Sequence, residues 1–332
     1  MFVLSFVTIL GIMLIAQLNP SLAVGDSFFM ADPNLSGEVK GIIDINDRQE
    51  KIISHQTDIG LLSPPQAVQL QAPIKKDLIT PAPTVTANSA VIFDTNSRKI
   101  LYEKNGDEIV SIASLTKLMT ALVVLDQDPD FAQEYMITKE DRVDGGRIFL
   151  FPGDVVTLGD LLNISLVGSA NTATLAMVHA LGMVETDFVS KMNTKAAQMG
   201  LRKTTFIDSV GLDPHTTSTA YELIEIAIAA FAQPKIKQAV LSDQYTFTTK
   251  QGRKRTVEST DSLLKFNKNY QILGGKTGYI DSAGFCFIGK FQNQAHRQEI
   301  VSVLLGSFDI KSRFAETDAL VRWVYDSYVW LE

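Results

Sequence analysis

The hydrophobic pattern of the chain changes period several times, and each change predicts a different kind of element. Residues 89–94 and 99–104 are short runs rich in branched and aromatic side chains, and the turn residues 95–97 separate them. Such runs are typical of paired strands, so we expect order to begin near Ser89. Apolar residues then recur with helical spacing in five segments, 113–125, 158–167, 172–181, 186–199 and 220–231.

The pattern returns to strands after this helical block. We predict strands over 244–250, 253–258, the segment around Lys276, 284–291 and 299–306, and then a helix over 311–328. The first two strands form a hairpin around Gly252. Strands, a helical block, then strands and a helix predict an α+β fold, in which a mixed sheet domain carries an inserted helical subdomain over about 115–240.

Two predicted helices carry signals at their ends. Gly200 follows the segment 186–199 and is expected to stop that helix. Thr219 and Glu222 have the spacing of a capping box at the start of 220–231. A further short helix is compatible with residues 42–53.

The first residues form an apolar run that is too short and too interrupted to indicate a membrane span by itself. Small residues at Ser21 and Ala23 match the positions that a signal peptidase reads, so we predict a signal peptide over 1–23 with cleavage after Ala23. No Lys or Arg precedes Lys40, which leaves an uncleaved N-terminal membrane anchor as the alternative. Both interpretations place the rest of the chain outside the cytoplasm, in a periplasm or at the outer face of the cytoplasmic membrane.

Residues 24–86 lack sustained periodicity, and prolines crowd into the second half of this stretch. This composition favours an extended tether over a packed domain. We therefore predict an extracytoplasmic linker over 24–86 and a folded domain over 87–332.

Composition excludes some partners and cofactors. A chain of 332 residues with 45% apolar and 20% charged residues is globular, and its net charge of −7 gives no basic footprint for nucleic acid. The single cysteine, Cys286, excludes an internal disulfide and a thiolate metal cluster, and its two phenylalanine neighbours predict a buried packing role. The four histidines have no metal-ligand spacing, so we expect neither a metal nor another cofactor.

A serine and a lysine stand one helical turn apart at the start of the segment 111–126. Ser114 and Lys117 share a face with apolar residues such as Leu118 and Ala121, so the lysine is expected to point inward. Burial disfavours the charged form of a lysine. An amine with such a lowered pKa can accept the proton of a neighbouring hydroxyl, which makes Ser114 a candidate nucleophile.

Alternatives remain open for this pattern and for a second one. The Ser-x-x-Lys spacing recurs at 262–265, which we interpret as a chance match. Ser169 and Asn171 lie at the junction of two predicted helices, where serine and asparagine are favoured N-caps, so a purely structural role is an alternative for both.

Lys276 belongs to Gly275-Lys276-Thr277, half of a phosphate-loop motif. The required first glycine is missing, because position 270 is Tyr270, and the context is strand–turn–strand with no helix N-terminus for a phosphate. The glycines around Lys276 are unusual in a strand unless another backbone approaches closely. The alternative is a lysine on a solvated strand edge.

Together, Ser-x-x-Lys, Ser-x-Asn and Lys-Thr-Gly, in this order, resemble the active site of penicillin-binding serine transferases and serine beta-lactamases. Separations of 55 residues from Ser114 to Ser169 and 107 from Ser169 to Lys276 suit that fold. Within it, residues of about 86–330 resemble the low-molecular-mass D-alanyl-D-alanine carboxypeptidases. The stretches that carry this resemblance are ASLTKLMTALVVLD, PGDVVTLGDLL, SANTATLAM, GLDPHTTSTAYEL, GGKTGYIDSAGF and RFAETDALVRWV.

The resemblance implies a three-layer α/β/α fold with a mainly antiparallel sheet. It also implies roles for the polar residues. Ser114 would attack the D-Ala–D-Ala carbonyl and carry the acyl group, and Lys117 would take the serine proton, its pKa lowered by burial and by the nearby Lys276. Ser169 would pass a proton to the leaving amine, while Asn171 would position Lys117 and the substrate amide.

The Lys-Thr-Gly strand would bind substrate. Lys276 and Thr277 would hold the terminal carboxylate, and the peptide would lie along the strand at Gly278 as an added strand. The backbone N–H groups of Ser114 and Tyr279 would form the oxyanion hole. The partners implied are peptidoglycan stem peptides, with beta-lactams as covalent inhibitors.

Two departures from the family pattern bear on the reaction. Many members have an arginine that supports carboxylate recognition where this chain has Tyr221, and the chain is expected to lack the β-rich C-terminal domain common in carboxypeptidases. The first expectation is a D,D-carboxypeptidase, and the alternative is a D,D-endopeptidase that cleaves cross-links.

Two other functions are weighed against these. A beta-lactamase is disfavoured because no Glu-x-x-x-Asn occurs between Ser169 and Lys276. A non-catalytic wall-binding or beta-lactam-sensing module remains an alternative.

Overall fold

The computed structural model describes residues 71–77, 79–265, 270–295 and 297–331. The chain divides into two units, residues 1–66 and 67–332, and every described residue lies in the second. The predicted leader, the compatible helix at 42–53 and most of the predicted linker lie outside the described residues. Among the helices that are described, none combines the length and the apolar character needed to cross a membrane.

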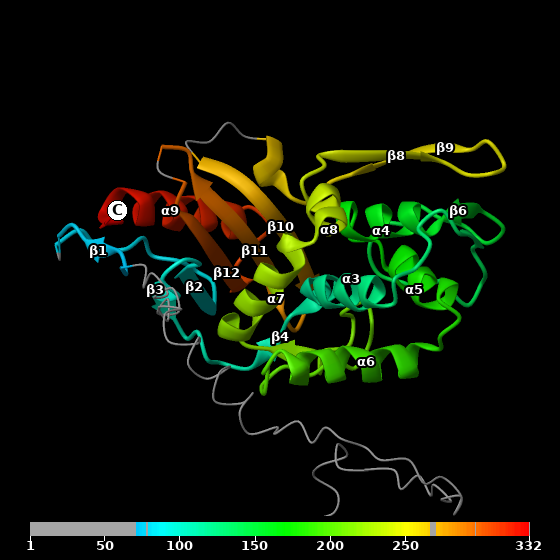
Figure 1. Cartoon of the computed structure of the whole chain (residues 1–332), viewed down its shortest axis with the longest axis horizontal. Helices are drawn as coiled ribbons and strands as arrows, with labels where there is room; N and C mark the ends of the chain where they lie inside the picture. Colours follow the sequence, from blue (N-terminus) through cyan, green and yellow to red (C-terminus); the bar gives the residue numbers. More distant parts are fainter. Residues whose placement is uncertain (1–70, 78, 266–269, 296, 332) are drawn as a thin grey trace, which may run out of the picture. The chain divides into compact units, whose positions relative to one another are not determined.

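A five-stranded antiparallel sheet forms the centre of this unit, with strand order β10-β11-β12-β2-β3 (Figure 1). Strands from the two ends of the domain meet where β12 pairs with β2. The predicted strands of this sheet are confirmed, and β10 forms one edge. Their bounds are Ser89–Asp94 for β2, Lys99–Lys104 for β3, Tyr270–Ile280 for β10, Gly284–Asn293 for β11 and Glu299–Ser307 for β12.

Alternating side chains on these strands enter two separate cores. Val91 and Phe93 of β2 belong to the larger core on one face, whereas Ala90 and Ile92 belong to the core on the other face. This is the period of two that a strand buried on both faces requires. The sheet is therefore covered on both sides.

Helices on the two faces complete three layers. The helices α7 (Ala220–Ala232) and α8 (Pro234–Val240) cover one face, and α9 (Ser312–Ser327) covers the other (Figure 1). The predicted α/β/α arrangement is confirmed.

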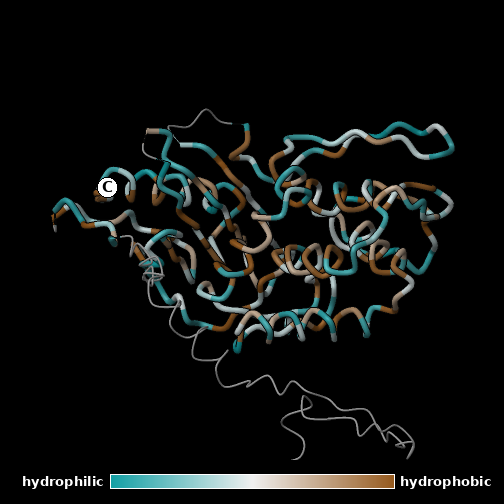
Figure 2. Tube along the Cα trace, in the orientation of Figure 1, coloured by the Kyte–Doolittle hydropathy of each residue, from teal (hydrophilic) through white to brown (hydrophobic). Residues whose placement is uncertain are grey.

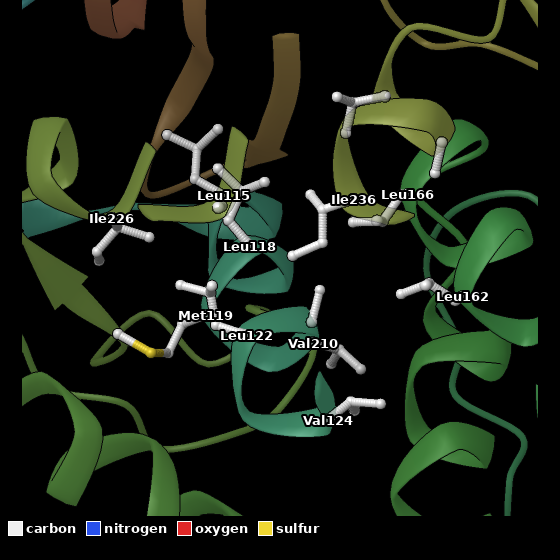
Figure 3. Packing of buried hydrophobic residues seen from close by; sticks show 14 of the residues in the cluster. Leu115, Leu118, Met119, Leu122, Val124, Leu162, Leu166, Val210, Ile226 and Ile236 are labelled. Carbon is white, nitrogen blue, oxygen red and sulfur yellow. The ribbon is translucent and has the colours of Figure 1, made fainter. Parts of the chain in front are cut away.

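The inserted helical block surrounds one central helix. Its elements are η1 (Ala113–Leu115), α3 (Thr116–Asp126), α4 (Leu158–Val167), α5 (Asn171–Ala180) and α6 (Glu185–Gln198). Helix α3 is buried on all sides from its first residue to Val124, and Figure 3 shows its leucines between side chains of α4, α7 and α8. Each buried leucine contributes about 1.5–3 kcal/mol relative to an exposed one. This packing fixes the position of the short 3₁₀ turn η1 that precedes α3.

Short strand pairs surround the main elements. They are β1 (Ile74–Lys75) with β13 (Tyr328–Val329), β4 (Val110–Ser111) with β7 (Thr217–Ser218), β5 (Glu134–Met136) with β6 (Val155–Thr157), and β8 (Gln244–Thr248) with β9 (Lys254–Glu258). The predicted hairpin is the β8–β9 pair, which carries mostly hydrophilic residues in Figure 2. A second 3₁₀ turn, η2, spans Ser262–Lys265.

Order begins earlier than the hydrophobic pattern predicts. Strand β1 pairs with β13 near the end of the chain, and Val85 is buried. The pattern missed this segment because a two-residue strand has no measurable period. The linker boundary at residue 86 stays a prediction, but residues from 71 onward already contact the domain.

The predicted end of α6 at Gly200 is confirmed, and the predicted capping box at the start of α7 is confirmed for one of its two hydrogen bonds. Gly200, the residue after the C-cap Met199 of α6, has a φ of 78°, and Leu201 N–H donates to Ala196 O, which closes the helix as predicted. Thr219 does accept a hydrogen bond from Glu222 N–H. The reciprocal half of the capping box is wrong, because the Glu222 carboxylate accepts from the backbone N–H groups of residues 202 and 203 instead.

Candidate active site

The three polar motifs meet at the edge of the sheet beside η1. Nζ of Lys117 lies 2.9 Å from Oγ of Ser114 and 2.8 Å from Oδ1 of Asn171. Nζ of Lys276 on β10 lies 2.8 Å from Oγ of Ser169. These two hydrogen-bonded groups form one polar cluster, because the charge of Lys117 acts on Lys276.

Backbone geometry holds the serine hydroxyl at the start of the buried helix. Ala113 has a φ of 48°, a conformation that costs energy in a residue with a Cβ. Its carbonyl accepts a hydrogen bond of 2.7 Å from Thr116. A Cβ at Gly211 would lie 2.0 Å from the same carbonyl oxygen, so only glycine fits there. The strained turn places Ser114 next to Lys117.

Lys117 is fully buried, as its helical position predicted. Its amine also lies 2.6 Å from the carbonyl oxygen of Val210. Burial lowers the pKa of Lys117 to about 7, against the opposing effect of the Asp208 charge. Near neutral pH the amine can therefore keep two hydrogen bonds, to Asn171 and Val210, and turn a lone pair toward Ser114.

The N-cap alternative for Ser169 and Asn171 is wrong. The N-cap of α5 is Ala170, and no side chain caps this helix. Asn171 is 5% exposed, and its Nδ2 donates to the carbonyl of Gly145 while its Oδ1 accepts from Lys117. Ser169 has a φ of 55° and accepts from Lys276. Both side chains face the cluster rather than their own helix.

The glycines of β10 permit close approach, and at Gly278 the neighbour is another backbone, as predicted, whereas at Gly274 and Gly275 the neighbours are side chains. A Cβ at Gly274 would lie 2.5 Å from the ring of Phe231. A Cβ at Gly275 would lie 2.4 Å from the Asp261 carboxylate, and one at Gly278 would lie 2.9 Å from the carbonyl oxygen of residue 112. The missing side chains let β10 run directly against η1.

Lys276 is 2% exposed, so the alternative of a solvated edge lysine is wrong. Its amine donates to Ser169 and to the carbonyl of Thr277, each at 2.8 Å. Burial lowers the pKa of Lys276 well below its usual range, and the charges of Lys117 and Arg313 lower it further. The repulsion between the two lysines therefore lowers the pKa of Lys276, whereas burial alone lowers the pKa of Lys117. The expected contribution of Lys276 to the pKa of Lys117 is not found.

A cavity of about 640 Å³ opens onto this cluster. Ser114, Ser169, Asn171 and Thr277 line it together with Gly278 and Tyr279, so six of the eight predicted site residues face one cavity. The other lining residues include Gly145, Gly146, Arg147, Leu212, Thr260, Ser262, Asp281, Ile310 and Arg313. The cavity thus lies beside β10, which ends the strand order of the sheet in the described part of the chain.

Arg313 is a cavity residue that sequence reasoning missed. It lies on the buried face of α9, is 5% exposed, and donates at 3.1 Å to the carbonyl of Gly278. Within the described residues its Nε has no hydrogen-bond partner. A charged residue in register with the apolar stripe of the last helix, at Leu320 and Val324, is the signal that could have found it.

Position 221, for which the resemblance to the family implies an arginine, does not line the cavity in this chain. Tyr221 packs against Gly106, and burial followed by the Glu103 carboxylate raises the pKa of its hydroxyl to about 12. The cation that reaches the Lys-Thr-Gly strand is therefore Arg313.

Asp208 is a second residue that the motifs did not reveal. Its carboxylate accepts backbone hydrogen bonds from residues 210, 211, 212 and 213. These bonds shape the loop that presents the Val210 carbonyl to Lys117 and the tight approach of Gly211 to η1. An aspartate before a glycine, as in Asp208-Ser-Val-Gly211, is a turn signal whose link to the lysine only the fold reveals.

Two other sequence interpretations can be compared with the structure. In the second Ser-x-x-Lys match, Lys265 pairs with Glu258 at 3.1 Å, so it does not repeat the buried arrangement. Cys286 is buried in the core and burial raises its thiol pKa to about 11, which confirms its packing role. No cluster of acidic, histidine and cysteine side chains among the described residues is arranged to hold a metal.

A serine next to a buried lysine, facing a cavity at the edge of an antiparallel sheet, defines the class of active-site serine enzymes to which penicillin-binding proteins belong. The family profile described as D-alanyl-D-alanine carboxypeptidase matches residues 76–309, and the chain belongs to this family. It is a serine D,D-peptidase, a hydrolase.

Named relatives include both kinds of D,D-peptidase. A D-alanyl-D-alanine endopeptidase of Pseudomonas aeruginosa is 28% identical over 82% of this chain and 84% of its own length. The D-alanyl-D-alanine carboxypeptidase DacF of Bacillus subtilis is 29% identical over 73% of this chain and 63% of its own length. A penicillin-binding protein of Listeria monocytogenes, solved in its ampicillin-bound form, superposes with a TM-score of 0.64 at 29% identity, over 74% of this chain and all of the other.

Proposed function

We propose that this chain hydrolyses D-alanyl peptide bonds of peptidoglycan through an acyl-enzyme on Ser114. The observation that carries this proposal is the position of the Lys117 amine, 2.9 Å from the serine hydroxyl, with a pKa of about 7. An amine that is half neutral near pH 7 can act as a general base at that pH.

The proposed reaction has two steps. Oγ of Ser114 attacks the carbonyl carbon of D-Ala as its proton moves to Lys117. The carbon–nitrogen bond then breaks; the leaving amine takes the proton of the Ser169 hydroxyl, and the proton held on Lys117 replaces it. A water then attacks the ester as Lys117 takes one of its protons, and Lys117 returns this proton to Oγ of Ser114 as the carbon–Oγ bond breaks and the acyl group leaves as a carboxylic acid. Asn171 holds Lys117 in place throughout, because its amide also bonds the loop at Gly145.

Developing negative charge on the carbonyl oxygen needs preorganised donors. We assign this role to the backbone N–H groups of Ser114 and Tyr279, and the tight contact of Gly278 with η1 supports it. Loss of one such donor typically costs about 3–4 kcal/mol in transition-state stabilisation.

Lys276, Thr277 and Arg313 are proposed to bind the carboxylate of the leaving residue. Lys276 and Arg313 are buried on two sides of the Lys-Thr-Gly strand. Burial and the charge of Arg313 lower the pKa of Lys276, and a bound carboxylate would favour the charged form of the amine. Thr277 adds a hydroxyl that is anchored to Thr260 at 2.7 Å. Charge-assisted hydrogen bonds of this kind are about twice as strong as neutral ones.

The proposed substrate of first choice is the terminal D-Ala of a stem peptide, which makes the chain a D,D-carboxypeptidase. Cleavage of cross-links, as a D,D-endopeptidase, is the second candidate. One observation favours it, namely a second cavity that shares Ser262 and Ile310 with the first.

The deciding experiment compares wild type and Ser114→Ala, produced from residue 71 onward and as the full chain, on defined muropeptides. Loss of D-Ala from pentapeptides supports the carboxypeptidase, and conversion of dimers to monomers supports the endopeptidase. Intact-mass analysis after incubation with a penicillin should find one adduct on wild type and none on Ser114→Ala. Wild type that yields neither products nor an adduct would contradict the proposal and favour a non-catalytic module.

The substrate also implies a location. We propose that the domain works outside the cytoplasm, and that residues 1–23 act as a signal peptide or as an anchor to the membrane. The intact mass of the protein recovered from cells would decide between the two, since cleavage after Ala23 removes a defined fragment. Recovery of active protein with the cytoplasmic fraction would contradict the location.

A further inference from the structure

A third cavity, of about 460 Å³, lies at the C-terminal end of α9 and is called the aromatic cavity below. Its lining includes Tyr325 of α9, Tyr328 of β13 and Trp330, which follows β13. Arg313, at the catalytic cavity, and Tyr325 are both on α9, where a rise of 1.5 Å per residue separates them by about 18 Å. The two cavities have no lining residue in common, so the aromatic cavity is a separate site.

Three aromatic side chains form the walls of this cavity, and the polar end of each is held by the protein. Nε1 of Trp330 donates to Oδ1 of Asp94 at 2.8 Å. The hydroxyls of Tyr325 and Tyr328 donate to backbone carbonyls at 3.1 and 2.7 Å. The Trp330 ring centroid lies 5.9 Å from that of Tyr325 and 6.5 Å from that of Tyr328. These residues therefore offer a ligand fixed ring surface rather than free donors.

The hydrogen-bonding groups of the cavity come from two amides and one amine. Asn293, Gln298 and Lys76 line it. Oε1 of Gln298 is buried, and among the described residues it has no hydrogen-bond partner. Since a buried acceptor without a donor costs free energy, this position favours a ligand that brings an N–H or O–H group. The Lys76 amine uses one donor on the carbonyl of Asp326, at 2.7 Å, and an ammonium group has three.

Charge around the cavity disfavours an anionic ligand. Burial raises the pKa of the Tyr325 hydroxyl, and the carboxylates of Glu299 and Asp94 raise it further. Two negative charges therefore act at the cavity wall and oppose the positive charge of Lys76. An uncharged polar ligand fits this balance better than a phosphate or a carboxylate.

The combination of ring surface and amide groups is suited to a sugar. A pyranose ring has C–H groups on its faces and hydroxyls around its edge, so it can pack on aromatic rings while amides bind its edge. An N-acetylamino sugar also has an amide N–H, which is the kind of donor that Oε1 of Gln298 lacks. The cavity volume falls within the range of about 300–1,000 Å³ that is usual for small-molecule sites.

We propose that the aromatic cavity binds an N-acetylamino sugar of a glycan strand, and that it holds the polymer while a stem peptide is cleaved in the catalytic cavity. The proposal rests on the proposed function for the identity of the polymer, which is peptidoglycan. The acetamido N–H is expected to donate to Oε1 of Gln298, and a sugar ring to lie against Trp330 and the two tyrosines.

Gln298→Met tests the site, because methionine keeps the length of the side chain and removes the acceptor. Gln238→Met, at an exposed position of α8 outside all three cavities, is the matched control. The probes are a β-1,4-linked oligosaccharide of N-acetylglucosamine and the glucose oligosaccharide of the same length, both without peptide. Titration of the full chain, followed by the nuclear magnetic resonance signals of the oligosaccharide, measures Kd.

We expect the wild type to bind the N-acetylglucosamine oligosaccharide at least about fivefold more tightly than the glucose one. Gln298→Met should weaken binding of the first about fivefold to tenfold, and Gln238→Met should not change it. The melting temperature of Gln298→Met should not fall, because the oxygen that it removes has no partner among the described residues. A purely structural role of Gln298 predicts the opposite, a lower melting temperature.

Three results would overturn the sugar site. They are no binding by the wild type, equal binding of the two oligosaccharides, or an equal change of Kd in Gln298→Met and Gln238→Met. Formation of a penicillin adduct on the same protein reports separately on the catalytic centre. An adduct without oligosaccharide binding contradicts only the sugar site, whereas selective binding without an adduct supports the sugar site and contradicts the proposed function.

Discussion

Nζ of Lys117 lies 2.9 Å from Oγ of Ser114, in a position without solvent contact. The amine is fixed from the other side by Asn171 and by the Val210 carbonyl. Removing the lysine proton therefore leaves the geometry in place and changes only the direction of one hydrogen bond. The protonation state of a single buried amine controls whether the hydroxyl is activated.

The first prediction concerns pH. A lysine with a pKa of about 7 is mostly charged below that pH and mostly neutral above it, so a general base at this position gains activity as pH rises. The rate of acylation by a penicillin should rise about tenfold per pH unit below the midpoint and level off above it. Stopped-flow acylation between pH 5 and 9 measures this, and a rate that does not vary across pH 7 would exclude Lys117 as the base.

The second prediction concerns Asp208, whose negative charge opposes the effect of burial on the pKa of Lys117. The Asp208 carboxylate raises the pKa of Lys117, so Asp208→Asn should move the midpoint of the pH–rate profile to lower pH. The same carboxylate accepts four backbone hydrogen bonds, so the substitution should also cost about 1–3 kcal/mol in the free energy of unfolding.

Asp243→Asn is the control for the second prediction, because this aspartate lies in the segment before β8, outside the cavity lining. It should leave the midpoint unchanged. A midpoint that stays at the wild-type value in Asp208→Asn, measured on protein whose melting curve shows it folded, would mean that Asp208 acts only on the loop.

Sequence reasoning reached the site through residues whose chemistry conflicts with their local pattern. Lys117 lies on an apolar helical face, and glycines interrupt the strand around Lys276. In the structure both lysines are buried, and the glycines lie in close contact with neighbouring atoms. Arg313 and Asp208 escaped notice because their partners, the Gly278 carbonyl and the Lys117 amine, are supplied by distant segments. The strand β1 escaped notice because it has only two residues and pairs with β13, at the other end of the domain.

The third prediction concerns carboxylate recognition by Arg313. Arg313→Gln removes the charge but keeps a donor for the Gly278 carbonyl, so the fold should persist. Since hydrogen bonds to charged groups contribute about 1.5–3 kcal/mol, kcat/KM for a peptide with a free carboxylate should fall about tenfold to a hundredfold. Steady-state kinetics on the peptide and on its C-terminal amide measure the effect, and the amide should lose nothing further.

Arg147→Gln is the matched control, because Arg147 also lines the cavity but is exposed. A similar loss in both variants would point to a general electrostatic effect of positive charge in the cavity. An equal loss on the peptide and on its amide would likewise contradict a specific role of Arg313 at the carboxylate.

The last prediction concerns the contact between the glycine strand and the nucleophile. A methyl group at Gly278 would lie 2.9 Å from the Ile112 carbonyl oxygen and 3.2 Å from the Cβ of Ala113, so Gly278→Ala must move β10 away from η1. The proposed oxyanion hole spans these two elements, and misplacing one donor should slow acylation about 10²–10³-fold.

Gly274→Ala is the comparison for Gly278→Ala, because its methyl group would meet the Phe231 ring at 2.5 Å and strain the core instead. It should cost about 1–3 kcal/mol in the free energy of unfolding with little change in acylation of the folded protein. If both variants lost stability and acylation in the same proportion, the contact at Gly278 would be a matter of packing alone, and the assignment of the oxyanion hole to Ser114 and Tyr279 would fall with it.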